Sequence, residues 1–154
     1  MQPQIHPRWG IGRVRLGMTR DEARARAGEP DRIEEDDELA GVRFGWHYER
    51  FGFSLYFDAD LGGRLTLVVC EAESTSVRGV RPIGMREAEA KRALAPIGAL
   101  ALDEEASDDA LRFHRIEDAG LGLLFADGVC ESVDLSVSLQ GDGELSWPNG
   151  DAPE

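Results

Sequence analysis

The chain has 154 residues, of which 42% are hydrophobic, and this length and composition predict one domain with a substantial core. A net charge of −13 argues against nucleic acid and anionic membranes as partners, since both would repel the chain. The same charge permits a basic protein partner, although it would also serve merely to keep the protein soluble.

Nothing in the sequence predicts export or a membrane anchor. No apolar run approaches the roughly 20 residues that span a bilayer, and residues 1–7 lack the basic start and apolar middle of a signal peptide. The two cysteines, Cys70 and Cys130, permit at most one disulfide. We expect a cytoplasmic protein in which both thiols are free.

The first predicted element is a helix over residues 20–27. Thr19 and Glu22 have the spacing of a capping box, in which each side chain accepts a hydrogen bond from the other residue's backbone N–H. A glycine and a proline follow the helix and end it. A second helix, with a poorer cap, is predicted over residues 86–95 and ends at Pro96.

Antiparallel strands follow each predicted helix, because apolar and polar residues alternate with a period of two. These strands cover residues 41–48, 51–58, 64–69, 110–116 and 133–139. Asp127-Gly128 is the pair that a tight type I′ hairpin favours. The acidic runs 34–38 and 103–109 are predicted to be solvated edges or loops, and residues 141–154 a polar, partly disordered tail.

The two halves of the chain share an ordered set of similar residues at an offset of 67 to 69. The matches are Leu16-Gly17-Met18 with Ile83-Gly84-Met85, Val42-Arg43-Phe44 with Leu111-Arg112-Phe113, 52–57 with 120–125, and Leu65 and Leu67 with Val133 and Leu135. We predict an α+β domain over residues 1–140, built from two tandem repeats at about 11–69 and 80–137. Each repeat contributes one helix and antiparallel strands to one curved six- to eight-stranded antiparallel sheet with the helices on one face.

A family resemblance rests on the string Leu16-Gly17-Met18-Thr19-Arg20-Asp21-Glu22 and on the later Gly28-Glu29-Pro30. The string resembles the opening of SmpA/OmlA-type domains, and also the repeats of the beta-lactamase inhibitor protein, which doubles a comparable unit. The resemblance implies a tandem fold whose curved sheet grips a partner protein. The chain departs from these families in having no signal peptide, no lipidation cysteine and no cysteine pair within each repeat.

The sequence contains no recognisable catalytic or nucleotide-binding motif, such as G-x-S-x-G, a Walker-type loop or a dinucleotide fingerprint. The acidic run 34–38 lacks the spaced ligands and the turn glycine of a calcium loop. His47 and His114 fall near the same point of the two repeats, which leaves a shared metal site as an alternative. Repeat symmetry places them a repeat apart instead. We therefore predict no cofactor, no metal and no catalytic residue.

The candidate partner-binding residues lie on the strand face opposite the core. If Leu55 and Phe57 face the helices, alternation places Tyr56 on the opposite face and, in the next strand, exposes Val68. We expect at least one aromatic residue of the segment 46–48 to share that face. The alternative is that Trp46 completes the core and that the open face contacts only solvent. The predicted partner-binding residues are Trp46, His47, Tyr48, Tyr56, Asp58, Arg64, Thr66, Leu124 and Asp134.

These observations predict a non-catalytic protein-binding module that captures a basic protein. An immunity protein that neutralises a basic bacterial toxin by occluding its active site fits the acidic charge and the missing catalytic motifs. One alternative is a small-molecule binder or an enzyme that uses the concave sheet face. Another is an assembly module like the SmpA-type proteins.

Overall fold

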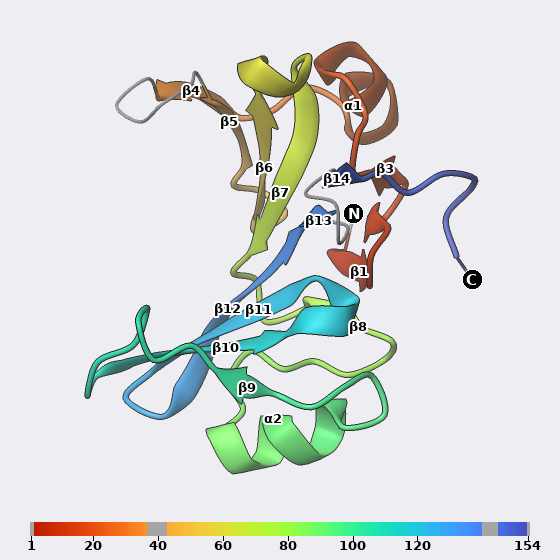
Figure 1. Ribbon diagram of the computed structural model, residues 1–154. Helices are drawn as coiled ribbons and strands as arrows, with labels where there is room; N and C mark the ends of the chain where they lie inside the picture. Colours follow the sequence, from red (N-terminus) through yellow and green to blue (C-terminus); the bar gives the residue numbers. More distant parts are fainter. Residues whose placement is uncertain (1, 37–42, 140–144, 154) are drawn as a thin grey trace.

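The computed structural model describes residues 2–36, 43–139 and 145–153, and its fold is α+β (Figure 1). The main feature is an eight-stranded antiparallel sheet with the strand order β4-β5-β6-β7-β12-β11-β10-β9. The prediction of an α+β fold with a large antiparallel sheet is confirmed. Among the described residues, no helix is long and apolar enough to cross a membrane.

Two helices, α1 (Arg20–Ala27) and α2 (Glu87–Leu94), each precede four strands of this sheet. The strands are β4 (Arg32–Asp36), β5 (Arg43–Tyr48), β6 (Phe53–Asp58), β7 (Arg64–Cys70), β9 (Ala101–Leu102), β10 (Leu111–Ile116), β11 (Leu121–Ala126) and β12 (Val129–Ser136). Two short 3-10 helices, η1 (Ala59–Leu61) and η2 (Glu117–Ala119), connect β6 to β7 and β10 to β11. Residues 37–42, where the predicted acidic run ends and the predicted strand 41–48 begins, lie outside the described residues.

The capping box forms at the start of α1. Glu22 N donates to Thr19 Oγ1 at 3.3 Å, and Thr19 N donates to Glu22 Oε1 at 3.2 Å. The N-cap of α2, Arg86, makes no capping hydrogen bond with its side chain. Because a helix of eight residues is marginal alone, α2 depends on the burial of Ala90 and Leu94.

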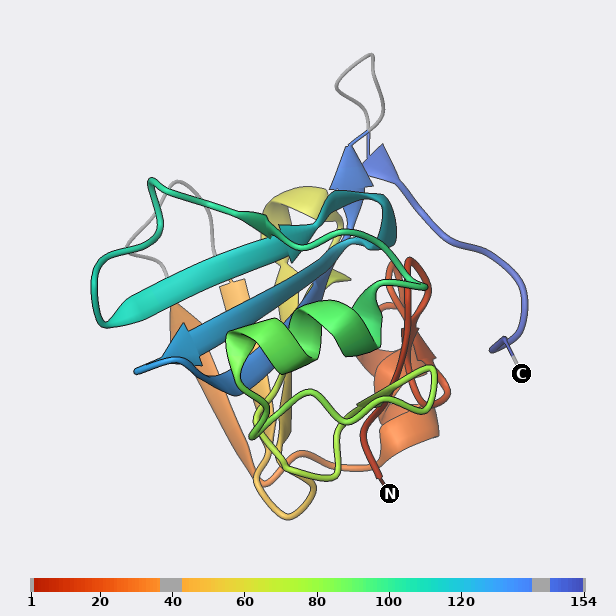
Figure 2. The same cartoon turned by 90° about the horizontal axis from the view of Figure 1, so that it is seen from below.

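Both helices cover the core side of the large sheet. Ala23 of α1 and Ala90 and Leu94 of α2 belong to one hydrophobic cluster with the inward side chains of six strands. These are Trp46, Tyr48, Phe53, Leu55, Phe57, Leu65, Val68, Cys70, Ile116, Leu121, Leu123, Phe125, Cys130, Val133 and Leu135. Cys70 and Cys130 are both free and buried. Figure 2 shows the green helix α2 alongside the blue strand β12, and in Figure 1 the red N-terminal strands lie between α1 and α2.

A second sheet, of four short strands, was not predicted. It consists of β3 (Val14–Arg15), β2 (Gly10–Ile11), β1 (Gln4–His6) and β8 (Ser76–Val77), in that spatial order. Ile5, Ile11, Val14 and Val77 from these strands complete the core. Because each strand has only two or three residues, the sequence shows no period of two from which to predict them.

A β-bulge in β7 reverses which side chains face the core. Thr66 is an extra residue between the partners of Phe57 and Tyr56. One extra residue shifts the alternation beyond it. Val68 is therefore fully buried, and Leu67 lies on the outer face beside Tyr56. The prediction that Val68 is exposed is wrong for this reason.

A second bulge, at Glu131 of β12, lies between the partners of Phe125 and Leu124. If residues 52–57 correspond to 120–125, Leu55 corresponds to Leu123. Leu55 pairs with Val68 and Leu123 pairs with Val133, so Val133 corresponds to Val68 and not to Leu65. The difference arises because the turn before β12 is shorter than the turn before β7. Phe44 lies on the core side of the sheet and Phe113 on the opposite side. The predicted correspondence between these two residues is therefore also wrong. Phe44 pairs with Phe57 and Phe113 with Leu124.

The described end of the chain packs against its beginning. Strand β13 (Ser138–Leu139) pairs with β14 (Leu145–Ser146), and Trp147 follows. A Cβ at Gly17 would lie 2.9 Å from Trp147 Cε3, so only glycine permits this contact. The Arg64 guanidinium lies 5.3 Å from the Trp147 ring centroid. Of the predicted disordered tail, residues 141–144 and 154 lie outside the described residues.

Candidate functional site

The face of the large sheet that is turned away from the helices, here named the open face, carries the candidate site. Strand pairing and alternation define its side chains. They are His47 of β5; Ser54, Tyr56 and Asp58 of β6; Leu67 and Val69 of β7; Ser132, Asp134 and Ser136 of β12; Gly122 and Leu124 of β11; and Phe113 and Arg115 of β10.

One row of paired residues crosses the open face over all eight strands. From β4 to β9 it consists of Arg32, His47, Ser54, Val69, Asp134, Gly122, Arg115 and Ala101. Val69 and Asp134 lie on the two middle strands of the sheet. The centre of the open face therefore holds a carboxylate beside an apolar side chain.

His47, Ser54 and Tyr56 form a cluster on one side of this centre. His47 Nδ1 lies 2.7 Å from Ser54 Oγ, and the His47 ring meets the Tyr56 ring edge-on with centroids 6.0 Å apart. Gly45 makes room for both rings, since a Cβ there would lie 3.0 Å from Tyr56 Cε1. Burial, followed by the charge of Arg32, lowers the pKa of His47, so its imidazole is neutral at pH 7.

Phe113, Gly122 and Asp134 meet on the other side of the centre. A Cβ at Gly122 would lie 2.5 Å from Phe113 Cζ and 2.6 Å from Asp134 Oδ2, so the ring edge and the carboxylate share the space above this glycine. Arg115 lies over the Phe113 ring, 4.9 Å from its centroid, and its Nε is 3.8 Å from Asp103 Oδ2. Burial raises the pKa of Asp134 to about 6, and the charge of Arg115 opposes this rise only in part.

Asp134 differs from the other carboxylates of the open face in having no partner among the described residues. No hydrogen-bond donor and no cation of the described chain lies within bonding distance of its side chain. Asp58, by contrast, accepts a hydrogen bond from Thr66 and another, at 3.2 Å, from Arg43 Nε. A half-buried carboxylate without a donor costs free energy in the folded protein, so its position calls for an explanation.

Two predicted partner-binding residues belong to the core instead. Trp46 is 2% exposed and packs against Phe57, with ring centroids 5.0 Å apart. Tyr48 is fully buried, and its hydroxyl donates a 2.7 Å hydrogen bond to Gly28 O. Since alternate residues of β5 face opposite sides, His47 alone of this segment shares the open face. Trp46 therefore completes the core, as the first part of the alternative states.

Two further predicted residues are occupied by contacts within the chain. Thr66, in the bulge, is only 5% exposed, and its hydroxyl donates to Asp58. Arg64 is exposed, but its guanidinium lies over Trp147. The predicted residues that the structure brings together on the open face with available groups are Tyr56, His47, Leu124 and Asp134.

Sequence reasoning missed four residues that line the same face. Leu67 and Val69 reach it only because of the bulge in β7, which the sequence pattern does not reveal. Phe113 and Arg115 alternate along β10 with the buried Ile116, a signal that the sequence did contain.

The His47–Ser54 pair does not amount to a catalytic triad. Glu34 Oε2 lies 3.2 Å from His47 Nε2, yet this nitrogen forms no hydrogen bond among the described residues. Glu34 also forms an ion pair with Arg32. A catalytic serine–histidine pair needs a third group that orients the imidazole through a hydrogen bond. The cluster does line a cavity of about 360 Å³.

The two histidines face opposite sides of the sheet and cannot share a metal ion. His114 lies on the core side, where its ring meets Phe125 edge-on and its Nε2 is 3.2 Å from Glu87 Oε2. In the part of the chain that the structure describes, no three His, Cys, Asp or Glu side chains are arranged to hold a metal.

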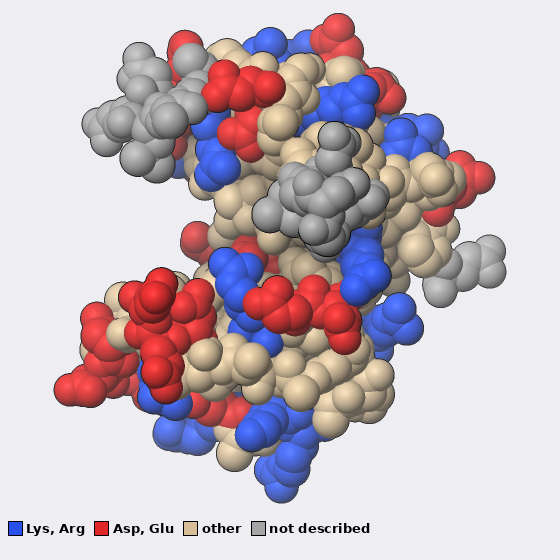
Figure 3. Space-filling view, in the orientation of Figure 1, with Lys and Arg blue, Asp and Glu red and all other residues tan. Residues whose placement is uncertain are grey.

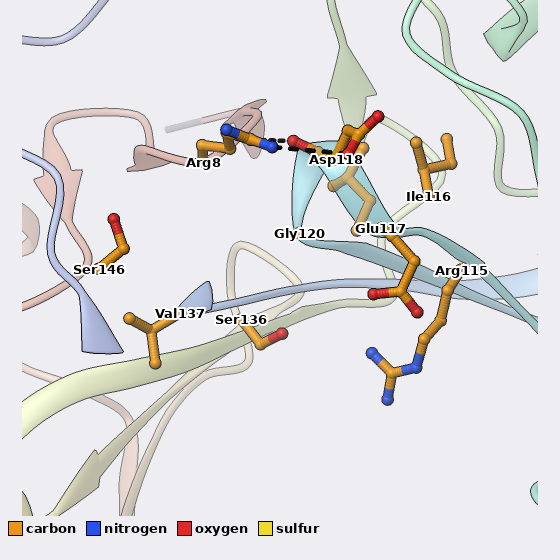
Figure 4. Close-up of a pocket in the computed structure, with 10 residues that line it drawn as sticks. Arg8, Arg115, Ile116, Glu117, Asp118, Gly120, Ser136, Val137 and Ser146 are labelled. Carbon is orange, nitrogen blue, oxygen red and sulfur yellow. Dashed lines mark hydrogen bonds and ion pairs between the residues drawn. The ribbon is translucent and has the colours of Figure 1, made fainter. Parts of the chain in front are cut away.

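A larger cavity, of about 580 Å³, lies where β10 and η2 meet the N-terminal segment (Figure 4). Arg8 lies 3.9 Å from Asp118 Oδ1 and its Nε donates to the Asp118 backbone oxygen. Arg115, Glu117 and Ser136 also line this cavity. Because cations and carboxylates of the chain already face one another here, we assign no ligand to it.

Acidic side chains lie on both margins of the open face, which also carries Arg32, Arg43 and Arg115. Figure 3 shows the molecule hollowed between the part with β4–β7 and the part with β9–β12, with red side chains on both margins. The exposed acids on these margins are Glu34 and Glu35 of β4, and Glu104, Glu105, Asp108 and Asp109 between β9 and β10. Exposed carboxylates therefore lie on both margins of the hollow.

Comparisons with protein-family models, with curated proteins and with solved structures find no significant match to this chain.

Proposed function

We propose that this chain is a non-catalytic binding module that captures a basic protein on its open face. The observation that carries this proposal is the combination of half-buried Tyr56, Leu67, Val69, Phe113 and Leu124 at the centre with carboxylates on both margins. An apolar, aromatic centre within a polar rim is the usual anatomy of a protein interface. The negative margins would steer a basic protein toward it.

We further propose that the partner is a basic bacterial toxin and that the chain acts as its immunity protein. The net charge of −13 supports an occluding role toward a basic partner. Occlusion needs only complementary shape and charge, so no cofactor enters the mechanism. The inhibitor-like string at residues 16–22 is consistent with this use of the scaffold.

In this proposal the two halves are tandem copies whose strands form one curved sheet. A helix followed by four strands occurs twice, and each half has a bulge at the same place in the hairpin of its last two strands, at Thr66 and at Glu131. The mirrored strand order about the β7–β12 pair supports it. A curved sheet would present the hollow as a concave surface for a protruding part of the partner.

The test uses the product of the adjacent gene, purified and assayed for its own activity. We expect the chain to bind it, to abolish its activity at equimolar concentration, and to lose affinity in Tyr56→Ala. Leu61→Ala, which truncates an exposed side chain of η1, is the matched control. A protein that binds equally to wild type and Tyr56→Ala, with no effect of salt on the association rate, would contradict capture by the open face.

A second candidate function is the binding of a small ligand by the His47–Ser54–Tyr56 cavity of about 360 Å³. The specific observation in its favour is His47 Nε2, which lies 3.2 Å from Glu34 Oε2 but forms no hydrogen bond among the described residues. Isothermal titration with a panel of small polar ligands, repeated with His47→Ala, tests this function.

A further inference from the structure

We propose that Asp134 receives one cationic side chain, a lysine or an arginine, from the partner. This proposal rests on the function proposed above and names the group that the open face recognises. It assigns the central carboxylate a role in binding that the fold itself does not require.

The side chains next to Asp134 in the strand pairing are short. Val69 and Gly122 are its direct neighbours across the sheet, and Ser132 and Ser136 are its neighbours along β12 on the same face. All four are small, and the space above Gly122 is taken by the Phe113 ring edge and the Asp134 carboxylate, so the approach to Asp134 lies over Val69 and the two serines. The two serine hydroxyls are able to accept hydrogen bonds from a guanidinium or an ammonium group.

The apolar surface beside the carboxylate suits the rest of such a side chain. Leu67 also lies on the open face, two residues from Val69 along β7. The methylene groups of lysine and arginine pack on apolar surface while their charged ends reach a partner. Phe113 closes the other side, with its ring edge next to Asp134.

No other carboxylate near the hollow is as well placed. Asp58 is held by Arg43 and Thr66, and Glu34 by Arg32. The acids at 104–109 are exposed on the margin. Asp134 alone combines a central position, partial burial and the lack of a partner among the described residues. Because its carboxylate is already partly dehydrated, binding a cation there requires less further desolvation.

Two titratable groups are coupled to Asp134 by charge. Arg115 of β10 partly neutralises Asp134, and the buried thiol of Cys70 at the end of β7 lies close enough for Asp134 to raise its pKa. Burial raises the pKa of Asp134, and a bound cation lowers it again because it favours the ionised form. Binding should therefore weaken as the pH falls through about 6.

The first experiment uses N-acetylarginine amide and, separately, N-acetyllysine amide as probes in about 0.15 M salt, where exposed charges are screened. Carboxyl carbon NMR follows the Asp134 titration. We expect a probe to lower the pKa of Asp134 and to shift the amide signals of residues 122 and 134. Asp134→Asn should lose these shifts, and Glu89→Gln, an exposed acid on α2, should keep them. Shifts spread over residues 104–109 and unchanged in Asp134→Asn would overturn the proposal.

The second experiment measures the affinity of the basic partner protein. We expect Asp134→Asn to weaken binding about 30-fold or more, as the truncation of a central charged contact does, and Glu89→Gln to leave it unchanged. If Tyr56→Ala weakens binding and Asp134→Asn does not, the role of Asp134 is refuted while capture on the open face stands. If no basic protein binds, the proposed function fails, and the amide probes still decide whether Asp134 receives a cation.

Discussion

Replacing Asp134 by asparagine should stabilise the folded protein at neutral pH. The pKa of this carboxyl rises from 3.8 to about 6 because burial disfavours its charged form. At 1.36 kcal/mol for each pH unit, that rise corresponds to about 3 kcal/mol, which is an upper bound for a side chain that keeps some exposure. We therefore expect the free energy of unfolding of Asp134→Asn to exceed that of the wild type by about 1–3 kcal/mol at pH 7.5.

The sign of the pH dependence follows from the two states. Between pH 3.8 and about 6 the folded protein holds a proton on Asp134 that the unfolded chain has already lost. Stability from this group therefore increases as the pH falls through that window. The asparagine variant has no such proton, so the difference between the two proteins should close by about pH 4.

Urea unfolding, followed by tryptophan fluorescence at several pH values from 7.5 to about 4, measures this difference. The other carboxylates are common to both proteins, so their contributions cancel in the comparison. Glu89→Gln serves as the control and should differ little from wild type at any pH. An Asp134→Asn protein that is less stable than wild type at pH 7.5, or a difference that does not change with pH, would refute the assignment of an unpaired, dehydrated carboxylate.

Other expectations follow from the core and from the open face. Trp46→Ala and Phe57→Ala should each lower the free energy of unfolding by about 3–5 kcal/mol in urea titrations, since both remove buried rings. Tyr56→Ala should change it by less than about 1 kcal/mol and raise the dissociation rate of the partner in surface plasmon resonance. The association rate should fall markedly as salt rises beyond physiological concentration, and a constant rate would contradict electrostatic steering. Cys70 and Cys130 should react with a thiol reagent only after unfolding, because burial raises the pKa of both thiols, to about 12 for Cys130. Rapid labelling of the native protein would contradict the burial of these thiols.

Local patterns in the sequence determined the first helix and the main hairpins. The capping box at Thr19 and Glu22 satisfies two backbone N–H groups within one turn, so it needs no distant partner. Alternation along β6 correctly separated Leu55 and Phe57 from Tyr56, because regular pairing preserves the period of two. Net charge, likewise a property of the sequence, underlies the proposal of a basic partner.

Tertiary structure decided the rest of the open face. The bulge at Thr66 inserts one residue into the pairing of β7 with β6, so Val68 turns to the core and Leu67 to the hollow. The sequence also did not indicate which side of β5 faces the helices. Trp46, His47 and Tyr48 are all large, and only tertiary packing places Trp46 and Tyr48 on the core side. The surroundings that partly bury Asp134 include Gly122 of β11 and Phe113 and Arg115 of β10, which are distant from Asp134 in the sequence. Local sequence records the preferences of neighbours in the chain, whereas the surroundings of a side chain on a sheet are set by pairing between distant segments.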